Sequence, residues 1–153
     1  SGGEGMLNVG KLNEGVVLDH IAAGKSMDLY KYLKLDKMDC SVAIIKNARS
    51  SKMGRKDIIK VECPIEDLKL DVLGYIDHTI TVNIIKDGEI VEKKILSLPH
   101  QLVNIIHCKN PRCITSIEQG LDHIFFLADP ENEIYRCRYC EERYRASRRK
   151  KQQ

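Results

Sequence analysis

Four cysteines in the C-terminal third of the chain carry its clearest chemistry. They form two close pairs, Cys108-Lys-Asn-Pro-Arg-Cys113 and Cys137-Arg-Tyr-Cys140. Two such pairs, with four and two intervening residues, have the spacing of a tetrahedral zinc site with four thiolate ligands. Four protein ligands fill the coordination shell and leave no position for water or substrate. We therefore expect one structural zinc ion per chain and no zinc catalysis.

The same region allows two other interpretations. Cys137 and Cys140 could form a redox pair, which predicts one exchangeable disulfide in place of a tightly held metal. A small zinc domain could also bind nucleic acid through the basic run Arg145–Lys151, although a solvated, frayed terminus explains that run more simply. The net charge of only +3 and the lack of interleaved aromatic residues weigh against nucleic acid. Cys40 and Cys63 have no partners nearby in the sequence and are expected to be buried free thiols.

Length and composition suit one medium domain or two small ones. The 153 residues are 42% hydrophobic and 31% charged, which is typical of a globular protein, and no apolar run approaches the roughly 20 residues of a membrane helix. No secretory signal is visible, so we expect a cytoplasmic protein whose six cysteines serve as metal ligands and free thiols. Residues 1–6 are expected to be a flexible tail or an expression remnant.

Strand patterns recur between residues 7 and 98. Apolar and β-branched residues predict strands at 15–21, 41–46, 57–61, 78–85 and 89–95. Asp87-Gly88 is a strong two-residue hairpin turn between the last two strands. Asn47 to Gly54 is expected to be a loop.

Two helices are expected between these strands. Ser26 should cap the first, with Met27, Tyr30 and Leu33 on one side. Pro64 should begin the second at its first position. The buried stripe of this second helix would comprise Ile65, Leu68, Val72 and Tyr75.

The resulting order is β-α-β-β-α-β with an extra hairpin strand, the pattern of a ferredoxin-like α+β fold. Both helices would cover one face of the sheet, and the first strand would lie between the third and the fourth. A domain boundary is expected at Leu98-Pro99-His100, giving an N-terminal domain of residues 7–98 and a small antiparallel β zinc domain of residues 99–153. The second domain has few apolar residues, so the metal would have to stabilise it.

Strand parity predicts a mixed polar and apolar patch on the open sheet face. If Ile59 and Val61 face the core, neighbours of opposite parity face outward. The residues sharing the open face would then be Lys56, Ile58, Lys60, Asn83 and Ile85, joined by Val17 and Asp19 if the first strand follows. Lys93 and Lys94 should lie close by, and His20 could donate to a phosphate. Cations, hydrogen-bonding groups and an apolar wall suit a nucleotide, although lysines on exposed strands more often serve solubility.

Motifs of catalysis are missing from the sequence. It contains no Walker loop or GxGxxG, no nucleophile paired with a base, and no paired catalytic carboxylates in a surrounding motif. This argues against enzymatic activity.

Several short sequence stretches are, in combination, specific enough to indicate a protein family. These are Gly15-Val-Val-Leu-Asp-His-Ile21, Met53-Gly-Arg-Lys-Asp-Ile-Ile-Lys-Val61, Thr81-Val-Asn83, Ser97-Leu-Pro99 and the two cysteine pairs, the second followed by Glu141. With them, the chain resembles the regulatory chain of aspartate carbamoyltransferase from about Leu7 to Tyr144. The resemblance implies a noncatalytic cytoplasmic subunit of pyrimidine biosynthesis. Its N-terminal domain would bind ATP, CTP and UTP, and its zinc domain would dock onto the catalytic chain.

The resemblance also implies an assembly and roles for single residues. Catalytic trimers would be bridged by regulatory dimers in a dodecamer, with ATP favouring the active state and CTP the inactive one. Asp19, Lys60 and Asn83 would recognise ribose and base, and His20 and Lys93 the triphosphate. The pocket lining would comprise Val9, Leu12, Val17, Ile58, Ile85 and Ile90, with Lys56 nearby. The residues facing the catalytic chain would be Asn110, Arg138, Tyr139 and Glu141.

Three positions depart from the family pattern. Gly10 stands where an acid is usual, Gly88 where an aromatic residue lies beside the base, and Glu142 where a basic residue lies near the docking surface. The basic tail after Tyr144 is a further departure.

Overall fold

The computed structural model describes residues 12–146. The chain divides into two compact units between Ser97 and Leu98. Each unit contains one antiparallel sheet, of five strands in the first and four in the second, which confirms the predicted α+β class. Across residues 12–146, no helix is long and apolar enough to cross a membrane.

The N-terminal sheet has its first strand in the middle. Its strands are β1 (Glu14–Ala22), β2 (Ser41–Ser50), β3 (Gly54–Glu62), β4 (Thr81–Lys86) and β5 (Glu89–Ile95). Their spatial order is β2-β3-β1-β4-β5, so β1 lies between β3 and β4 as predicted. Asp87 (φ 52°) and Gly88 (φ 80°) form the hairpin turn between β4 and β5, and both adopt the left-handed conformation that such a turn requires.

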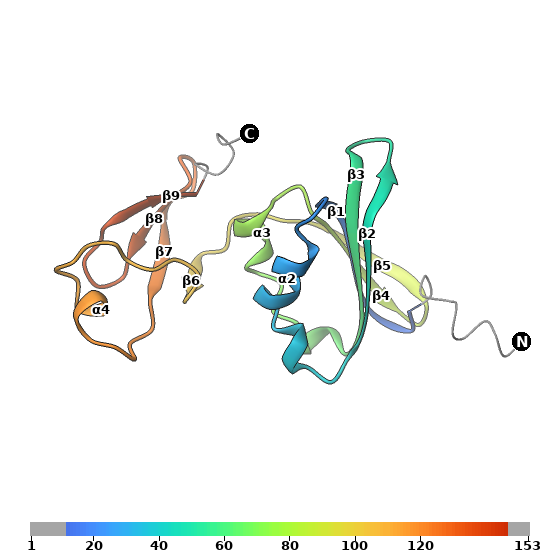
Figure 1. The fold of residues 1–153 in the computed structure, drawn as a ribbon, viewed down its shortest axis with the longest axis horizontal. Coiled ribbons are helices and arrows are strands. Elements are labelled where there is room, and N and C mark those ends of the chain that lie inside the picture. The colour runs from blue at the N-terminus through green and yellow to red at the C-terminus, as the bar shows by residue number, and fades with distance from the viewer. Residues whose placement is uncertain (1–11, 147–153) are drawn as a thin grey trace, which may run out of the picture. The chain divides into compact units, whose positions relative to one another are not determined.

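Short helices cover one face of this sheet (Figure 1). They are α2 (Ser26–Tyr32), the 3-10 turns η1 (Leu35–Lys37) and η2 (Ile65–Asp67), and α3 (Leu73–Ile76). The core lies between the two layers: Val16, Leu18, Ile59, Val61 and Val82 from the sheet are fully buried against helical residues that include Leu29, Leu33 and Leu73. Burying each of these side chains stabilises the fold by about 1.5–3 kcal/mol before the entropic cost is counted.

The first helix differs from its prediction in its cap and its buried side. Lys25 is the N-cap residue, and Ser26 lies inside the helix with its hydroxyl donating to Asp57. Met27 is 45% exposed, whereas Leu29 and Leu33 are buried. The reason is that the buried Ser26–Asp57 contact fixes Ser26 toward the sheet, and residues three and seven positions later share its face.

The predicted continuous helix after Pro64 was wrong. The chain makes one 3-10 turn, η2, then runs extended from Leu68 before the four-residue helix α3. This arrangement packs Leu68, Leu70 and Leu73 against the same core. In one continuous helix, Leu70 and Leu73 would lie on sides different from that of Leu68, so burial of all three side chains outweighs the helical pattern.

The boundaries of β2, β3 and β4 also differ from those predicted. β2 extends to Ser50 and β3 begins at Gly54, so the predicted loop shrinks to a short turn in which the Met53 amide donates to Ser50 Oγ (3.0 Å). Gly54 has a φ of 77°, which suits this turn. β4 begins at Thr81, because Thr79 turns back to Asp77 through both its amide and its hydroxyl.

The C-terminal unit is built on four short strands. They are β6 (Gln101–Val103), β7 (Ile124–Asp129), β8 (Ile134–Cys137) and β9 (Arg143–Arg145), in that spatial order, with one helical turn, α4 (Ile114–Ile117). Phe125 and Tyr135 are fully buried, and the Tyr135 hydroxyl donates to the Pro99 carbonyl (2.6 Å). Two large side chains make a small core, which agrees with the expectation that this unit needs a metal.

A buried carboxylate connects three segments of the N-terminal unit. Asp57 is fully buried, and its oxygens accept hydrogen bonds from the Gly24 amide (3.0 Å), from the amide and hydroxyl of Ser26 (3.2 and 2.6 Å) and from the Asn47 amide (2.8 Å). Burial raises the pKa of Asp57, but these donors, Ser26 first, outweigh it and hold the pKa below its usual value. Asp57 thereby holds the β1–α2 turn and the bulge of β2 onto β3.

Asp57→Asn is expected to destabilise the N-terminal unit by about 2–3 kcal/mol. The asparagine side chain would carry no charge, and its NH2 group would face backbone N–H donors to which it cannot bond. The folded-state pKa of Asp57 lies below the unfolded value of about 3.9. Its contribution is therefore present above about pH 4 and is lost as the pH falls through the folded pKa. Urea unfolding at a series of pH values should show that the difference in free energy of unfolding between the wild type and Asp57→Asn becomes smaller in acid. Asp71→Asn, at an exposed turn, is the control; an Asp57→Asn curve parallel to wild type at all pH values would contradict this role.

Candidate metal centre and open sheet face

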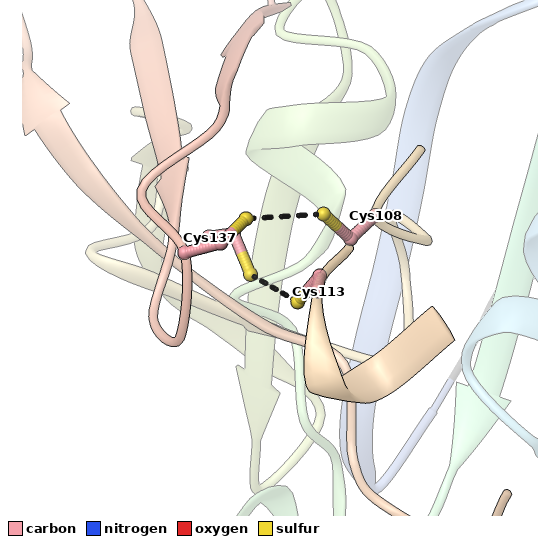
Figure 2. Close-up of side chains that lie close together, drawn as sticks. Cys108, Cys113 and Cys137 are labelled. Atoms are coloured by element: carbon pink, nitrogen blue, oxygen red, sulfur yellow. Dashed lines mark hydrogen bonds between the residues drawn. The ribbon is translucent and has the colours of Figure 1, made fainter. Parts of the chain in front are cut away.

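The four predicted cysteine ligands converge on one point. Their sulfur atoms all lie within 4.8 Å of one another, with Cys108 Sγ 3.5 Å from Cys140 Sγ and Cys113 Sγ 3.7 Å from Cys137 Sγ. Figure 2 shows Cys108 and Cys113 facing Cys137. A tetrahedral zinc ion with Zn–S bonds of about 2.3 Å separates its sulfurs by roughly 3.8 Å. The cluster therefore fits a zinc ion closely.

Tight turns present both pairs of thiols. In the first pair, the Cys113 amide donates to the Asn110 carbonyl (3.0 Å). In the second, the Glu141 amide donates to the Cys137 carbonyl (2.8 Å), and Glu141 adopts a left-handed φ of 65°. Each turn folds its two cysteines toward the same side, as the short spacings predicted.

The surroundings shift the pKa values of the thiols in opposite directions. Burial raises the pKa of Cys108 to about 12 and also raises that of Cys137. Burial raises the pKa of Cys113, but the hydroxyl and amide of Thr115 outweigh it and lower the pKa to about 7. The Thr115 hydroxyl lies 3.1 Å from Cys113 Sγ. The Cys108 amide donates to His123 Nδ1 (3.3 Å), which fixes the first turn. Thr115 and His123 were missed by the sequence reasoning; only the position of Thr115, two residues after a ligand, could have suggested its role.

The redox interpretation of Cys137 and Cys140 does not fit this geometry. The sulfur contacts join Cys140 to Cys108 and Cys137 to Cys113, so each thiol of the C-x-x-C pair contacts a thiol of the other pair. All four cysteines are free of disulfides. The arrangement is a four-ligand cluster, and the donor set is that of a closed structural site.

The residues expected to face a catalytic chain flank this cluster. Asn110 lies between the first two cysteines, where its side chain accepts from the Arg112 amide (3.0 Å). Arg138, Tyr139 and Glu141 surround Cys140, and all three are exposed, Tyr139 to 46%. Of the basic tail, only Arg145 and Ala146 are described; its remainder lies outside the described residues.

On the N-terminal sheet, strand register aligns the predicted nucleotide residues in rows. Lys60 pairs with Val17, Val17 with Asn83, and Asn83 with Lys93, so these four lie side by side across β3, β1, β4 and β5. Their parity is opposite to that of the buried Ile59, Leu18 and Val82, which places them on the face away from the core. Lys94 pairs with Val82 and therefore belongs to the other face, contrary to the expectation that it joins Lys93.

Asp19 and Ile58 share the parity of this row and lie beside it, where a bulge interrupts the pairing of β1 with β3. Asp19 pairs with Thr81, whose place on this face the sequence reasoning missed although its parity with Asn83 indicates it. Lys56 Nζ lies 2.9 Å from Asp19 Oδ1. Burial raises the pKa of Asp19, but the Lys56 ammonium and the His20 amide outweigh it, so the pKa lies below its usual value. His20 lies in a bulge of β1 with a φ of 61°, and its Nδ1 is 3.1 Å from Thr81 Oγ1.

Toward the β4–β5 hairpin, the face becomes apolar. Ile85 pairs with Ile90; Ile85 is buried and Ile90 is 63% exposed. Leu12 is also buried, and its carbonyl lies 4.0 Å from the position that a side chain at Gly88 would occupy. Gly88 has a φ of 80°, so in this turn an aromatic residue at its position would be strained. Val9 and Gly10 lie outside the described residues.

Together, these features define a chain of two compact units with a four-cysteine metal centre and a mixed polar and apolar open sheet face, and with no assembled reacting groups among the described residues. Comparison with known families agrees. Residues 7–97 match the allosteric domain of the aspartate carbamoyltransferase regulatory chain, and residues 100–149 match its metal binding domain.

Relatives extend this match over nearly the whole chain. The aspartate carbamoyltransferase regulatory chain of Clostridium botulinum strain Hall is 50% identical over 139 residues, which cover 91% of this chain and 94% of the relative. Those of Clostridium tetani and Bifidobacterium longum are 48% and 43% identical, over 92% and 89% of this chain and 97% of each relative. The chain therefore belongs to the family of aspartate carbamoyltransferase regulatory chains. It is a noncatalytic, regulatory component of pyrimidine synthesis that associates with a catalytic chain.

Cys113→Ser is expected to abolish tight zinc binding and to unfold the C-terminal unit. Structural zinc contributes roughly 10–16 kcal/mol in small domains, far more than this core can replace. Elemental analysis should fall from about one zinc per chain to near zero. The amide NMR signals of β6–β9 should lose their chemical-shift dispersion, while those of the N-terminal sheet keep theirs. Cys40→Ser is the matched control and should retain zinc. A metal-free Cys113→Ser chain with β6–β9 still folded would contradict the structural role.

Proposed function

We propose that this chain binds ATP, CTP and UTP at one overlapping site on the open face of the N-terminal sheet. The observation that carries the proposal is the row formed by Lys60, Val17, Asn83 and Lys93. It brings two ammonium groups, an amide and an apolar seat onto four adjacent strands. A nucleotide needs this combination, because phosphates require cations while the base requires a flat surface and hydrogen-bonding groups.

Each part of the nucleotide has a group suited to it. The Asn83 side chain both donates and accepts hydrogen bonds and can read the edge of a base, while Lys60 can donate to base or ribose oxygens. The lowered pKa of Asp19 keeps its carboxylate ionised as an acceptor for ribose hydroxyls, and the ion pair with Lys56 orients it. His20 and Lys93 lie beside these groups and would bind the triphosphate. Ile58 and Ile85 provide apolar surface.

The second half of the proposal concerns transmission to the catalytic chain. The zinc turns carrying Asn110, Arg138, Tyr139 and Glu141 would dock onto that chain. Ile117, 66% exposed on the adjoining short helix, offers further apolar contact area. Docking would take place in a cytoplasmic dodecamer of catalytic trimers bridged by regulatory dimers. A nucleotide acts only by binding the two states of the assembly with different affinity, and a coupling of order 1–3 kcal/mol suffices.

Lys60→Ala is expected to weaken CTP binding by roughly 10- to 150-fold, the equivalent of one charge-assisted hydrogen bond of about 1.5–3 kcal/mol. Calorimetric titration of the zinc-loaded chain measures the change. Lys52→Ala, which removes an exposed lysine in the β2–β3 turn, is the charge-matched control and should bind as the wild type does. Equal affinity in the Lys60 and Lys52 variants would place the nucleotide elsewhere.

Mixing the chain with its cognate catalytic trimer should produce regulated catalysis. Aspartate saturation curves should shift to lower aspartate with ATP and to higher aspartate with CTP, because each nucleotide favours one state of the assembly. Curves unaffected by ATP, CTP and UTP, in an assembly verified by its mass, would contradict the proposal. The catalytic trimer alone, with the same nucleotides, is the control.

A further inference from the structure

Two cysteines outside the metal centre lie at matching ends of paired strands. Ser41 and Glu62 form the terminal pair in the register of β2 with β3. If this register continues by one step, it places Cys40 opposite Cys63, just beyond the ends of the two strands. Val42, two residues after Cys40, pairs with Val61, two residues before Cys63, and Val61 is fully buried. Side chains two positions apart share a face, so alternation directs both cysteines to the core side of the sheet.

The two thiols are close enough to interact. Both are free thiols, both contact the core of this unit, and both line the same hollow. Facing residues on antiparallel strands have Cα atoms about 4.5–5.5 Å apart, which lies within the range of about 4.4–6.8 Å that a disulfide accepts. A bond between Cys40 and Cys63 therefore requires little backbone movement.

The thiols differ in accessibility. Cys63 is 7% exposed, whereas Cys40 is half-buried. Both line a hollow of about 610 Å³ whose rim carries four acids, Asp39, Glu62, Glu66 and Asp67, and one cation, Lys69. Burial and the neighbouring Cys40 thiol raise the pKa of Cys63 to about 12. Because Cys40 is also the more exposed thiol, an external reagent reacts at Cys40 first.

We propose that Cys40 and Cys63 form an oxidisable dithiol site, which low-molecular-weight disulfides, cationic ones above all, convert to an intramolecular disulfide. The acidic rim attracts a cationic disulfide and repels an anionic one. The site is separate from the zinc cluster and does not depend on nucleotide binding.

The reaction proceeds by two thiol–disulfide exchanges. Cys40, after losing its proton, attacks the reagent RS–SR and forms Cys40–S–S–R, releasing one thiolate RS⁻. Cys63 then loses its proton and attacks the Cys40 sulfur, which forms the Cys40–Cys63 bond and releases the second RS⁻. The protein loses two electrons and two protons, and the reagent is reduced to two thiols.

The disulfide would close the β2–β3 hairpin into a covalent loop of residues 40–63. This loop contains Lys60, so the bond would restrain one edge of the open sheet face. Such a bond constrains the unfolded chain, and the N-terminal unit should melt at a higher temperature after oxidation.

The test treats the zinc-loaded full chain with cystamine or with oxidised glutathione at equal concentrations. Cystamine should produce a species lighter by two hydrogens, containing a Cys40–Cys63 linked peptide and its full zinc content. At low salt it should form at least roughly tenfold faster than with oxidised glutathione, and the difference should shrink in high salt.

Single-cysteine variants separate the two steps. Cys63→Ser should accumulate a mixed disulfide at Cys40, because no second thiol displaces the reagent. Cys40→Ser should leave Cys63 unreacted on the same timescale. A stable mixed disulfide in the wild-type chain, linkage confined to the zinc cysteines with loss of metal, or no reaction at either cysteine would each overturn the proposal. Equal rates with both reagents at low salt would contradict the role of the acidic rim.

Discussion

The pairing of β1 with both β3 and β4 is the constraint on which the N-terminal unit depends. It places Val16 and Leu18 in the core and Val17 and Asp19 on the opposite face. Because side chains alternate along a strand, a slip of one residue would exchange the two sets and expose the core. The same register that buries the apolar residues therefore aligns Lys60, Val17 and Asn83. One set of backbone hydrogen bonds therefore fixes both the core and the residues of the open face, and Asp57 adds restraint where β1 leads into α2.

In the C-terminal unit, metal coordination has the corresponding role. Phe125 and Tyr135 are its largest fully buried side chains, and the two cysteine turns bring the four sulfurs within 4.8 Å of one another. A closed thiolate shell cannot activate water or substrate, but it holds the Asn110 and Tyr139 turns rigidly. Rigidity of this surface is what a chain needs if it is to transmit a ligand signal to another protein without performing chemistry itself.

Much of this organisation could be predicted from the sequence. The cysteine spacings specified the ligand cluster, because short turns leave few ways to orient four thiols. The alternation in Ile59-Lys60-Val61 and Ile80–Ile84 identified the open face. The helix expected after Pro64 was wrong, since tertiary burial of Leu70 and Leu73 overrides helical periodicity. The partners of Asp57 and the meeting of Cys40 with Cys63 depend on residues far apart in the chain, and only the strand register brings them together.

In the proposed function, nucleotide occupancy of the open sheet face and the state of the catalytic chain are thermodynamically coupled. The most direct measurement is the dissociation constant of CTP for the assembled complex, with and without a saturating bisubstrate analogue at the catalytic sites. Linkage requires each ligand to change the affinity of the other by the same factor. The analogue should therefore weaken CTP binding by at least about fivefold. Identical CTP binding curves in the two conditions would contradict this coupling.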